Sequence, residues 1–408
     1  MEPRLWDASE LRTKFSNALS DLYRAEVPLY ASLIDIVKEV DSDVLKDQGK
    51  TLDDLPLRNQ LERHGAIRLA TDHEMQMIKR LFAILGMYPV GYYDRTVVSF
   101  PLHGTEFRPI SATALQQNPF RVFTTVLRRD LIVPDILEAV DRALGRRNLF
   151  TPRLCEIIDS AEKDGTMAPQ EADDFISEAF TIFKWHSRST VSLEGYLKLK
   201  QEHPVIADIV CFPSAHINHL TPRTLDIDRV QRKMIQNNLP AKAYIEGPPL
   251  RSCPILLRQT SFTALAEAVE FVHPNGQSIR GTHTARFGEI EQRGAALTTK
   301  GRDLNDQLHA SVIQNSTNIF RSALSTAMSH AFRRFPDSWE ELRVQNLVFF
   351  RYAVVQPRKK LATEESIISP RVAISHLLSL GLIRYEPITY EELSSVICRG
   401  DLQIKSSG

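Results

Sequence analysis

The sequence predicts an α+β fold in which two β-rich modules face one another, with a large helical insertion between them and helical additions at both ends. Two observations support this fold class. A strand-like segment, a helix and further strand-like segments follow one another from residue 64, and the same order returns after residue 206. Between these regions, apolar residues recur at spacings of three and four, as in amphipathic helices. Two half-barrels of this kind would bring residues that are distant in sequence into one site.

We expect five regions along the 408-residue chain. They are an N-terminal helical lead-in (1–60), a first β-rich module (61–110), a helical insertion (111–205), a second β-rich module with the metal site (206–297) and a mainly helical C-terminal region (298–408). The lead-in has apolar residues at helical spacing over 8–40, and the C-terminal region contains one apolar strand candidate at 347–355.

The first module begins with the strand-like segment HGAIRLAT, residues 64–71. A helix should start directly after it, because Thr71 and Glu74 have the spacing of a capping box. Strand-like stretches follow over 88–93 and 96–110. The second module repeats this order: the apolar segment IADIVCF is interpreted as a strand, a helix follows, and the final strand lies in THTARFGEIEQRG.

The composition narrows the class of protein. The chain is 43% apolar and 25% charged, which is typical of a globular domain. Its 50 basic and 50 acidic side chains leave no net charge, which argues against nucleic acid or an anionic membrane as a partner. The sequence has no apolar run long enough for a transmembrane helix. Because its four cysteines are widely spaced and no signal-peptide pattern is present, we expect a cytoplasmic protein.

His64 and Arg68 are the first candidates for chemistry. They lie four residues apart, so on a strand they share one face with their Cα atoms about 13 Å apart. A metal bound by His64 and a carboxylate bound by Arg68 would then hold a short dianionic substrate at both ends. The alternative is a structural histidine beside a surface arginine.

His216 and His219 supply the second candidate ligand. On a strand the two imidazoles point to opposite faces, so only one would serve a given site. We favour His219, because it precedes a helix start as His64 does, and we interpret His216 as a supporting or structural residue. If the segment were helical, both imidazoles would share a face and could chelate a metal together.

Glu289 and Glu291 supply the third candidate ligand, since both point the same way on the predicted final strand. The alternative pairs them with Arg286 or Arg293 in surface salt bridges. Gln259, on a neighbouring strand-like segment, would place an amide donor in the site.

Two imidazoles and one carboxylate are the usual ligands of a mononuclear, oxygen-activating iron. His283 shares the face of Glu289 and is interpreted as a structural or supporting imidazole. The sequence contains no dinucleotide-binding glycine motif after a strand, no Walker A loop and no nucleophile elbow, so the other common enzyme chemistries have no matching pattern.

Several long and unusual motifs lie between about residues 60 and 300. They are RHGAIRLAT, FAILGMYPVGYYD, FRPI, NPFRVFTTVLR, ADIVCFP, HINHLTPRTLDIDRVQ, EGPP, PILLRQTSF and GTHTARFGEIEQRG. Together they resemble the 2-oxoadipate dioxygenase/decarboxylase family, also called hydroxyglutarate synthase. This family is similar to the vicinal oxygen chelate superfamily, which includes 4-hydroxyphenylpyruvate dioxygenase. The resemblance implies two βαβββ modules that form an incomplete barrel around a metal.

The resemblance also implies roles for individual residues. EIEQR resembles the ligand-bearing E-x-x-Q-R strand of the superfamily, which favours Glu289 over its neighbouring glutamate. Fe(II) would be bound by His64, His219 and Glu289. The substrate would contact Arg68 and Val396 as well as the two histidines.

The implied reaction is the oxidative decarboxylation of 2-oxoadipate by O₂ to 2-hydroxyglutarate and CO₂, in lysine catabolism. The expected partners are therefore a small 2-oxo diacid and O₂. Two alternatives remain within enzymes: a redox-neutral, metal-dependent lyase or isomerase, and the same oxygenase chemistry on a different 2-oxo acid. A binding protein without catalysis is a further alternative.

Overall fold

The computed structural model describes residues 6–96, 99–272, 276–314, 321–354, 370–390 and 392–393. The chain divides into two compact units, each made of two segments. Unit 1 comprises Met1–Lys242 and Gln259–Gln292, and unit 2 comprises Ala243–Arg258 and Arg293–Gly408. No helix within the described ranges is long and apolar enough to cross a membrane.

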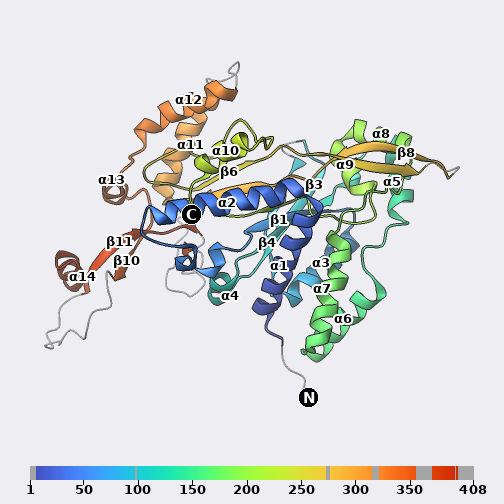
Figure 1. Ribbon diagram of the computed structural model, residues 1–408, viewed down its shortest axis with the longest axis horizontal. Coiled ribbons are helices and arrows are strands. Elements are labelled where there is room, and N and C mark those ends of the chain that lie inside the picture. The colour runs from blue at the N-terminus through green and yellow to red at the C-terminus, as the bar shows by residue number, and fades with distance from the viewer. Residues whose placement is uncertain are drawn as a thin grey trace. The chain divides into compact units, whose positions relative to one another are not determined.

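Unit 1 begins with two helices, α1 (Ala8–Glu26) and α2 (Pro28–Lys46), drawn in blue in Figure 1. The Asp7 side chain caps α1 by accepting hydrogen bonds from two backbone N–H groups of the first turn. Pro28 begins α2, where its missing N–H costs nothing. The helical lead-in predicted over 8–40 is therefore confirmed as two helices. Two 3-10 turns follow, at Leu52–Asp54 (η1) and Leu57–Asn59 (η2).

A five-stranded mixed sheet forms the centre of unit 1, in the order β2-β3-β4-β1-β5. β1 runs parallel to β4 and antiparallel to β5, and the β2–β3 and β3–β4 pairs are antiparallel. The bounds are β1 His64–Leu69, α3 Asp72–Ile84, β2 Tyr88–Asp94, β3 Leu102–Arg108, β4 Arg121–Leu127 and β5 His219–Thr221. As predicted, Thr71 caps α3, and its side chain accepts a hydrogen bond from the Glu74 backbone N–H.

The region 111–205, predicted to be a helical insertion, contains one central strand as well as helices. That strand is β4, whose Val122, Thr124 and Val126 are buried while Arg121, Phe123 and Thr125 are only partly buried. The period-2 pattern of RVFTTVL is short and lies between long helical segments, which is why the sequence interpretation missed it. The helices are α4 Ala112–Gln117, η4 Arg129–Leu131, α5 Pro134–Leu144, α6 Pro152–Asp164, α7 Pro169–Phe183 and α8 Leu193–Glu202.

A second correction concerns IADIVCF, which was interpreted as a strand. Most of it lies in helix α9 (Pro204–Val210), where Pro204 takes the first position and the His203 side chain accepts a hydrogen bond from the Val205 backbone N–H. A short apolar run fits a buried helix as well as a buried strand, so periodicity alone could not distinguish them.

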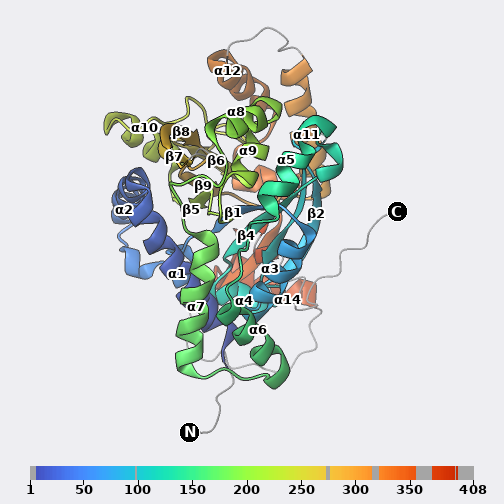
Figure 2. The same ribbon diagram turned by 90° about the vertical axis from the view of Figure 1, so that its right-hand side faces the viewer.

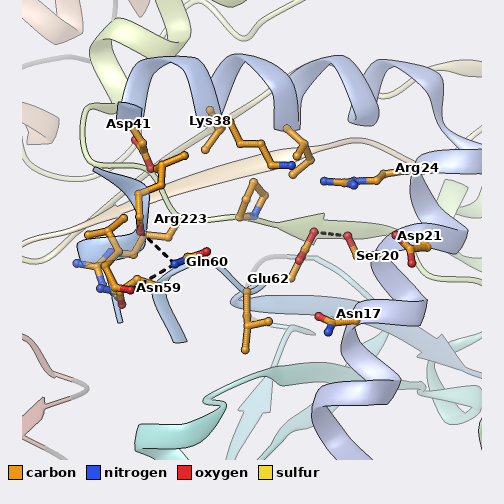
Figure 3. A pocket seen from close by; sticks show the side chains of 16 residues that line it. Asn17, Ser20, Asp21, Arg24, Lys38, Asp41, Asn59, Gln60, Glu62 and Arg223 are labelled. Carbon is orange, nitrogen blue, oxygen red and sulfur yellow. Dashed lines mark hydrogen bonds between the residues drawn. The ribbon is translucent and has the colours of Figure 1, made fainter. Parts of the chain in front are cut away.

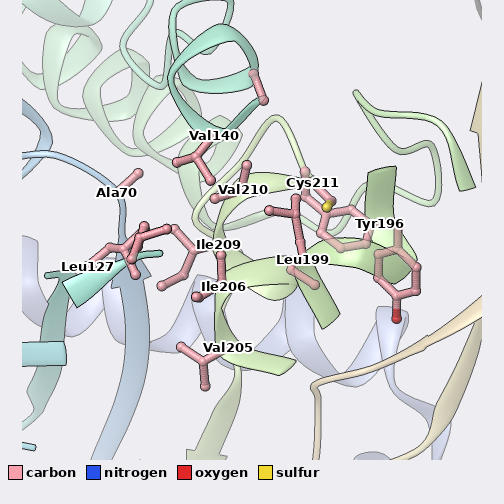
Figure 4. Packing of buried hydrophobic residues seen from close by; sticks show 14 of the residues in the cluster. Ala70, Leu127, Val140, Tyr196, Leu199, Val205, Ile206, Ile209, Val210 and Cys211 are labelled. Carbon is pink, nitrogen blue, oxygen red and sulfur yellow. The ribbon is translucent and has the colours of Figure 1, made fainter. Parts of the chain in front are cut away.

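The buried face of α9 belongs to a large hydrophobic cluster of unit 1 (Figure 4). Val205, Ile206 and Ile209 of α9 are nearly inaccessible to solvent. They pack in one cluster with Leu199 of α8 and Val140 of α5. Burying a Val, Leu or Ile side chain stabilises a fold by about 1.5–3 kcal/mol, so the cluster fixes α9 firmly within unit 1.

A second β-rich region follows β5, and its helix and strands belong to unit 1 except for Leu257, Arg258 and Arg293. Its elements are α10 Ile227–Gln236, β6 Leu257–Ser261, β7 Ala266–Val272, β8 Ser278–Thr284 and β9 Glu289–Arg293. β6 pairs with β9, and β7 pairs with β8. Just after β5, the Thr224 backbone N–H donates to the Glu291 carbonyl (2.9 Å) and the Glu291 N–H donates to the Pro222 carbonyl (3.1 Å). β1, β5 and β9 therefore lie side by side, and the two histidine-bearing strands are neighbours in one sheet.

Figure 2 shows that α1 and α7 run beside one another in unit 1. Their contact includes Phe15 and Phe180, whose ring centroids are 5.7 Å apart. Phe183 also packs edge-on against Phe15. The N-terminal lead-in is therefore part of the same core as the helical region that follows β4.

Within its described residues, unit 2 is mainly helical and contains one small sheet. Its elements are α11 Thr299–Gln314, α12 Arg321–Ala331, η5 Phe332–Arg334, α13 Trp339–Val344, β10 Phe350–Val354, α14 Pro370–Ser379 and β11 Ile383–Pro387. β10 confirms the strand candidate predicted at 347–355 and pairs antiparallel with β11. Its core is built from Leu308, Phe332, Phe335 and Leu342, together with residues of the unit's first segment such as Ile255.

Candidate metal centre

Three neighbouring strands bring the predicted ligands together. His64 begins β1, His219 begins β5 and Glu289 begins β9. In the antiparallel β1–β5 pair, His64 lies opposite Thr221 and His219 lies opposite Ala66. One ligand atom from each of His64, His219 and Glu289 lies within 4.8 Å of the other two. These three residues, called the metal centre below, have the spacing and chemistry of a possible metal site.

The ligand atoms of the metal centre are connected by short contacts. His64 Nε2 lies 3.0 Å from Glu289 Oε1. The Thr221 hydroxyl donates to Glu289 Oε1 at 3.1 Å and also lies 3.1 Å from His64 Nε2. The Gln259 amide donates to the same carboxylate oxygen at 2.9 Å, so the structure places this predicted donor in the site. These contacts hold the Glu289 carboxylate toward the imidazoles.

Thr221 was not identified from the sequence. Threonine is common in strands, and nothing around Thr221 distinguishes it from an ordinary strand residue. Its position depends on the β1–β5 register, which places it directly opposite His64. Only the pairing of the two strands therefore reveals it.

Packing fixes the two imidazole rings. The His219 ring stacks on Phe287, with centroids 4.7 Å apart and planes at 21°. The His64 ring packs edge-on against Phe123 of β4, at 5.4 Å and 88°. Gly65 allows the two strands to approach, because a Cβ atom there would lie 2.8 Å from Ile217 Cδ1 and 3.2 Å from the His219 carbonyl oxygen. The site is built on rigid, closely packed strands.

Glu291 lies behind the metal centre and is fully buried. One carboxylate oxygen lies 3.4 Å from His64 Nδ1, and the other lies 3.5 Å from Nε of the equally buried Arg63. Metal-binding histidines usually donate their second ring N–H to a carboxylate or carbonyl group. Glu289 thus faces the ligand atom of His64, and Glu291 faces the opposite nitrogen.

The surface salt bridges considered as the alternative role of the two glutamates are not formed with Arg286. Its guanidinium instead binds Glu26 at 2.6 Å and Glu267 at 2.5 Å. It also lies over the Trp185 ring, 4.7 Å from the centroid. This buried arginine therefore ties α1 to β7.

Burial and hydrogen bonding set the protonation of the metal centre. Burial lowers the pKa of His219 to about 3, although Glu289 opposes this, so the imidazole is neutral. Burial would raise the pKa of Glu289, but the hydrogen bonds from His64 and Thr221 and the charges of the two imidazoles together outweigh it, and the pKa is lowered. Burial would likewise lower the pKa of His64, but its hydrogen bonds with Glu289 and Glu291 raise it. An ionised carboxylate and a neutral imidazole are the forms that bind a cation.

Arg68 lies on β1 on the same face as His64, as predicted. Its Nη1 donates to Asp208 Oδ2 at 2.5 Å. The other carboxylate oxygen of Asp208 contacts His216 Nε2 at 3.1 Å and His283 Nε2 at 2.8 Å. The structure therefore places these two candidate supporting histidines beside Arg68, not beside the metal centre.

Asp208 was not identified from the sequence, although a signal was present. It is the only charged residue in the apolar run IADIVCF. An acidic side chain in such a run is rarely fully buried without a partner, so it indicated an internal contact. Val396, which the resemblance implies as a substrate contact, lies outside the described residues.

A separate cavity of about 440 Å³ opens in unit 1 between α1, α2 and the turns before β1 (Figure 3). Its lining does not include the three residues of the metal centre. Arg24 and Lys38 face it from the two helices, and Glu62 is held by the Ser20 and Tyr30 hydroxyls at 2.5 and 2.9 Å.

The chain is similar to proteins of known name over nearly its whole length. A family model for 2-oxoadipate dioxygenase/decarboxylase matches residues 15–396. The 2-oxoadipate dioxygenase/decarboxylase of Escherichia coli (strain K12) is 44% identical over 97% of this chain and 88% of its own length. The protein of the same name from Pseudomonas putida is 42% identical over 96% of this chain and 86% of its own length.

Solved structures agree with this similarity. The hydroxyglutarate synthase of Pseudomonas putida in complex with 2-oxoadipate superimposes with a TM-score of 0.81 at 39% identity, over 95% of this chain and 87% of that one. A glyoxalase superfamily protein from Ralstonia eutropha has a TM-score of 0.50 at 18% identity, over 69% of this chain and 84% of that one, and shares the fold alone. The chain therefore belongs to the 2-oxoadipate dioxygenase/decarboxylase family of enzymes.

Proposed function

We propose that this protein is an Fe(II)-dependent dioxygenase that converts 2-oxoadipate and O₂ into 2-hydroxyglutarate and CO₂. The observation that carries the proposal is the convergence of His64, His219 and Glu289 within 4.8 Å in a member of this enzyme family. The solved relative from Pseudomonas putida binds 2-oxoadipate, which supports the choice of substrate. Lysine breakdown in the cytoplasm is the setting we propose for the reaction.

The donor set fits iron. Two imidazoles and one carboxylate on one side of a metal leave adjacent positions open, as in other non-haem Fe(II) oxygenases. Bound Fe(II) would activate O₂ and offer adjacent positions for the 2-oxo acid and O₂, while decarboxylation and hydroxylation of the substrate supply the electrons that reduce O₂. In the atom balance, one oxygen atom completes the new carboxylate and the other becomes the hydroxyl group.

The protein side chains would orient the reactants. Arg68 binds the distal carboxylate, since a guanidinium presents paired N–H donors to a carboxylate. Thr221 and Gln259 hold the Glu289 carboxylate in place through the contacts described above. A misplacement of about 1 Å in such a site can cost roughly a hundredfold in rate, so these contacts matter for catalysis as well as for metal binding.

The test is a reconstitution in two steps. Metal-free protein is loaded with Fe(II) under anaerobic conditions, mixed with 2-oxoadipate and then exposed to O₂. O₂ consumption, CO₂ and 2-hydroxyglutarate are measured together, and we expect a ratio of one to one to one.

Two outcomes would contradict the proposal. Turnover of 2-oxoadipate before O₂ is admitted would favour a redox-neutral lyase or isomerase at the same metal centre. Fully iron-loaded protein that consumes O₂ with another 2-oxo acid but not with 2-oxoadipate would overturn the substrate assignment. Loading with Zn²⁺, which has no redox chemistry, is the matched control and should give no turnover.

A further inference from the structure

Asp208 is a buried carboxylate that three cationic or N–H-bearing side chains surround. Its side chain is only 4% exposed. Oδ2 accepts from Arg68 Nη1 at 2.5 Å, while Oδ1 faces His216 Nε2 at 3.1 Å and His283 Nε2 at 2.8 Å. We call Arg68, Asp208, His216 and His283 the Asp208 cluster. Both carboxylate oxygens are occupied, so the carboxylate has a single orientation.

The surroundings of the Asp208 cluster hold the two imidazoles in turn. The Tyr196 hydroxyl lies 3.0 Å from His283 Nδ1, on the side of the ring away from Asp208. The Trp185 ring packs edge-on against His216 at 4.8 Å and stacks on His283 at 6.1 Å with an interplanar angle of 11°. α9, which carries Asp208, is fixed by the hydrophobic cluster of Figure 4.

The electrostatics keep the carboxylate charged. Burial would raise the pKa of Asp208, but the charge of Arg68 and the contact with His216 hold it well below its usual value. Burial lowers the pKa of His216 against the opposing effect of Asp208, so this ring is neutral and donates one N–H. An ionised carboxylate at this place therefore faces a permanently charged guanidinium.

A stability role alone does not account for this arrangement. Taking a carboxylate and a guanidinium out of water costs several kcal/mol per ion, and a buried ion pair is often no more stabilising than apolar packing. The Arg68 side chain is nevertheless a quarter exposed. A guanidinium carries five N–H donors, so a bond to Asp208 leaves it able to bind a second carboxylate.

We infer that Asp208, fixed by His216 and His283, is a positioning residue that sets the place of the Arg68 guanidinium and thereby selects the chain length of the 2-oxo diacid. The inference rests on the proposed function. His64 and Arg68 are held about 13 Å apart by β1 at their Cα atoms, but a flexible arginine could reach diacids of several lengths. Asp208 removes that freedom, so that only one distance between the metal centre and the guanidinium is available.

The test compares wild-type protein with Asp208→Asn, using iron-loaded enzyme and two substrates. These are 2-oxoadipate and 2-oxoglutarate, the analogue that is one methylene shorter. We expect the KM for 2-oxoadipate to rise about tenfold, which corresponds to about 1.4 kcal/mol. The kcat should change far less, and the preference for the longer diacid in kcat/KM should narrow at least threefold.

Two further measurements separate positioning from other roles. Iron content should equal that of the wild type, and anaerobic binding of 2-oxoadipate, measured by calorimetry, should weaken by the same factor as KM. Asp159→Asn is the matched control, because it removes an exposed aspartate that pairs with Arg80 at 2.6 Å, and it should change none of these values. If Asp208→Asn does not fold, His283→Gln should give a smaller shift in the same direction.

The possible outcomes distinguish a failure of the proposed function from a failure of the role inferred for Asp208. Wild-type protein without 2-oxoadipate turnover would overturn the proposed function. Active wild type with an unchanged KM and unchanged chain-length preference in Asp208→Asn and His283→Gln would overturn the inference alone. The inference would also be overturned if Asp208→Asn lost part of its iron while the remaining iron-loaded protein kept the wild-type KM. Asp208 would then act on the metal centre.

Discussion

The metal centre and the Asp208 cluster contain the same kinds of side chain in opposite arrangements. In the metal centre, two imidazoles and a carboxylate each bring one ligand atom within 4.8 Å of the other two. In the Asp208 cluster, two imidazoles and a guanidinium direct N–H groups at one carboxylate. The first arrangement attracts a cation, whereas the second already contains one.

Histidine and carboxylate content alone therefore does not identify a metal site. The two sites differ in the role of the carboxylate. It is a ligand beside the imidazoles in the metal centre, whereas it accepts hydrogen bonds from the imidazoles in the Asp208 cluster. Arg68 decides this for Asp208, because a guanidinium stays charged at every relevant pH and neutralises the carboxylate. The metal centre has a buried arginine too, Arg63, but it faces Glu291 and leaves Glu289 to the imidazoles.

The largest expected effect is that of Glu289→Ala. We expect iron binding and 2-oxoadipate turnover to be lost, because the remaining two imidazoles carry no negative charge to hold Fe(II). Metal analysis after anaerobic loading measures the first effect and O₂ consumption the second. Glu270→Gln is the control, since this glutamate on β7 is exposed, and it should bind iron normally. Normal iron content in Glu289→Ala would show that Glu289 is not a ligand.

Glu291→Gln should weaken the affinity for iron by about 10–100-fold without abolishing it, the usual cost of changing a residue that supports a metal ligand. The reason is that Glu291 faces His64 Nδ1 and does not face the ligand atoms. Iron titration measures the affinity, and activity should return at high iron concentration. If Glu291→Gln lost iron binding as completely as Glu289→Ala, Glu291 could no longer be distinguished from a metal ligand.

Gln259→Met should weaken iron affinity about tenfold, because it removes a hydrogen bond that orients a ligating carboxylate. The amide donates to Glu289 Oε1 at 2.9 Å, and methionine has a similar length but no N–H donor. The same iron titration provides the measurement. Gln170→Met, at an exposed position of α7, serves as the control. Unchanged affinity would mean that Thr221 alone holds the carboxylate.

Asp41 is a third buried carboxylate, and its hydrogen-bond donors are neutral groups. The substitution Asp41→Asn tests how its charge affects stability. Its Oδ1 accepts from the Thr224 hydroxyl and the Leu225 N–H, each at 2.8 Å. Burial raises its pKa to about 6, although these hydrogen bonds oppose the rise. A raised folded-state pKa contributes stability that is complete below the unfolded pKa near 4 and is lost as pH rises through about 6.

Asp41→Asn has no carboxyl group, so it should not lose this contribution. The difference between the free energies of unfolding of Asp41→Asn and the wild type should therefore shift by about 1–3 kcal/mol in favour of Asp41→Asn between pH 4 and pH 7.5. Denaturant unfolding at a series of pH values measures the difference. Asp43→Asn, on the same helix but partly exposed and paired with Arg229, is the control and should show no such trend. A constant difference across this pH range would contradict the assignment.

Strand periodicity and the family resemblance together pointed to His64, His219 and Glu289, which the structure brings within 4.8 Å of one another as a possible metal site. Alternation along a strand placed His64 and Arg68 on one face, and the family resemblance distinguished Glu289 from its neighbour. Thr221 and Asp208 could not be placed in the same way, because their contacts depend on strand register and on helix α9. These are tertiary features that the spacing of residues along the chain does not determine.

The sequence predicted the α+β class with its mixed sheet and helical regions, but not every element. The lead-in helices and the start of α3 followed from apolar spacing and capping residues. β4 was missed because its seven residues lie between helices, and its pairing with β1 spans more than 50 residues of sequence. α9 was interpreted as a strand because a fully buried apolar run carries no periodicity.

β1 is bonded on both edges, to β4 and to β5. A strand held in this way cannot slide by one residue without turning every side chain to the opposite face. The distance between His64 and Arg68 along β1 is therefore fixed. Insertions or deletions within β1 would destroy the site and would not lengthen the distance between its two ends. Under the proposed function, a change in the preferred diacid length would therefore have to come from the residues that hold Arg68 and not from β1 itself.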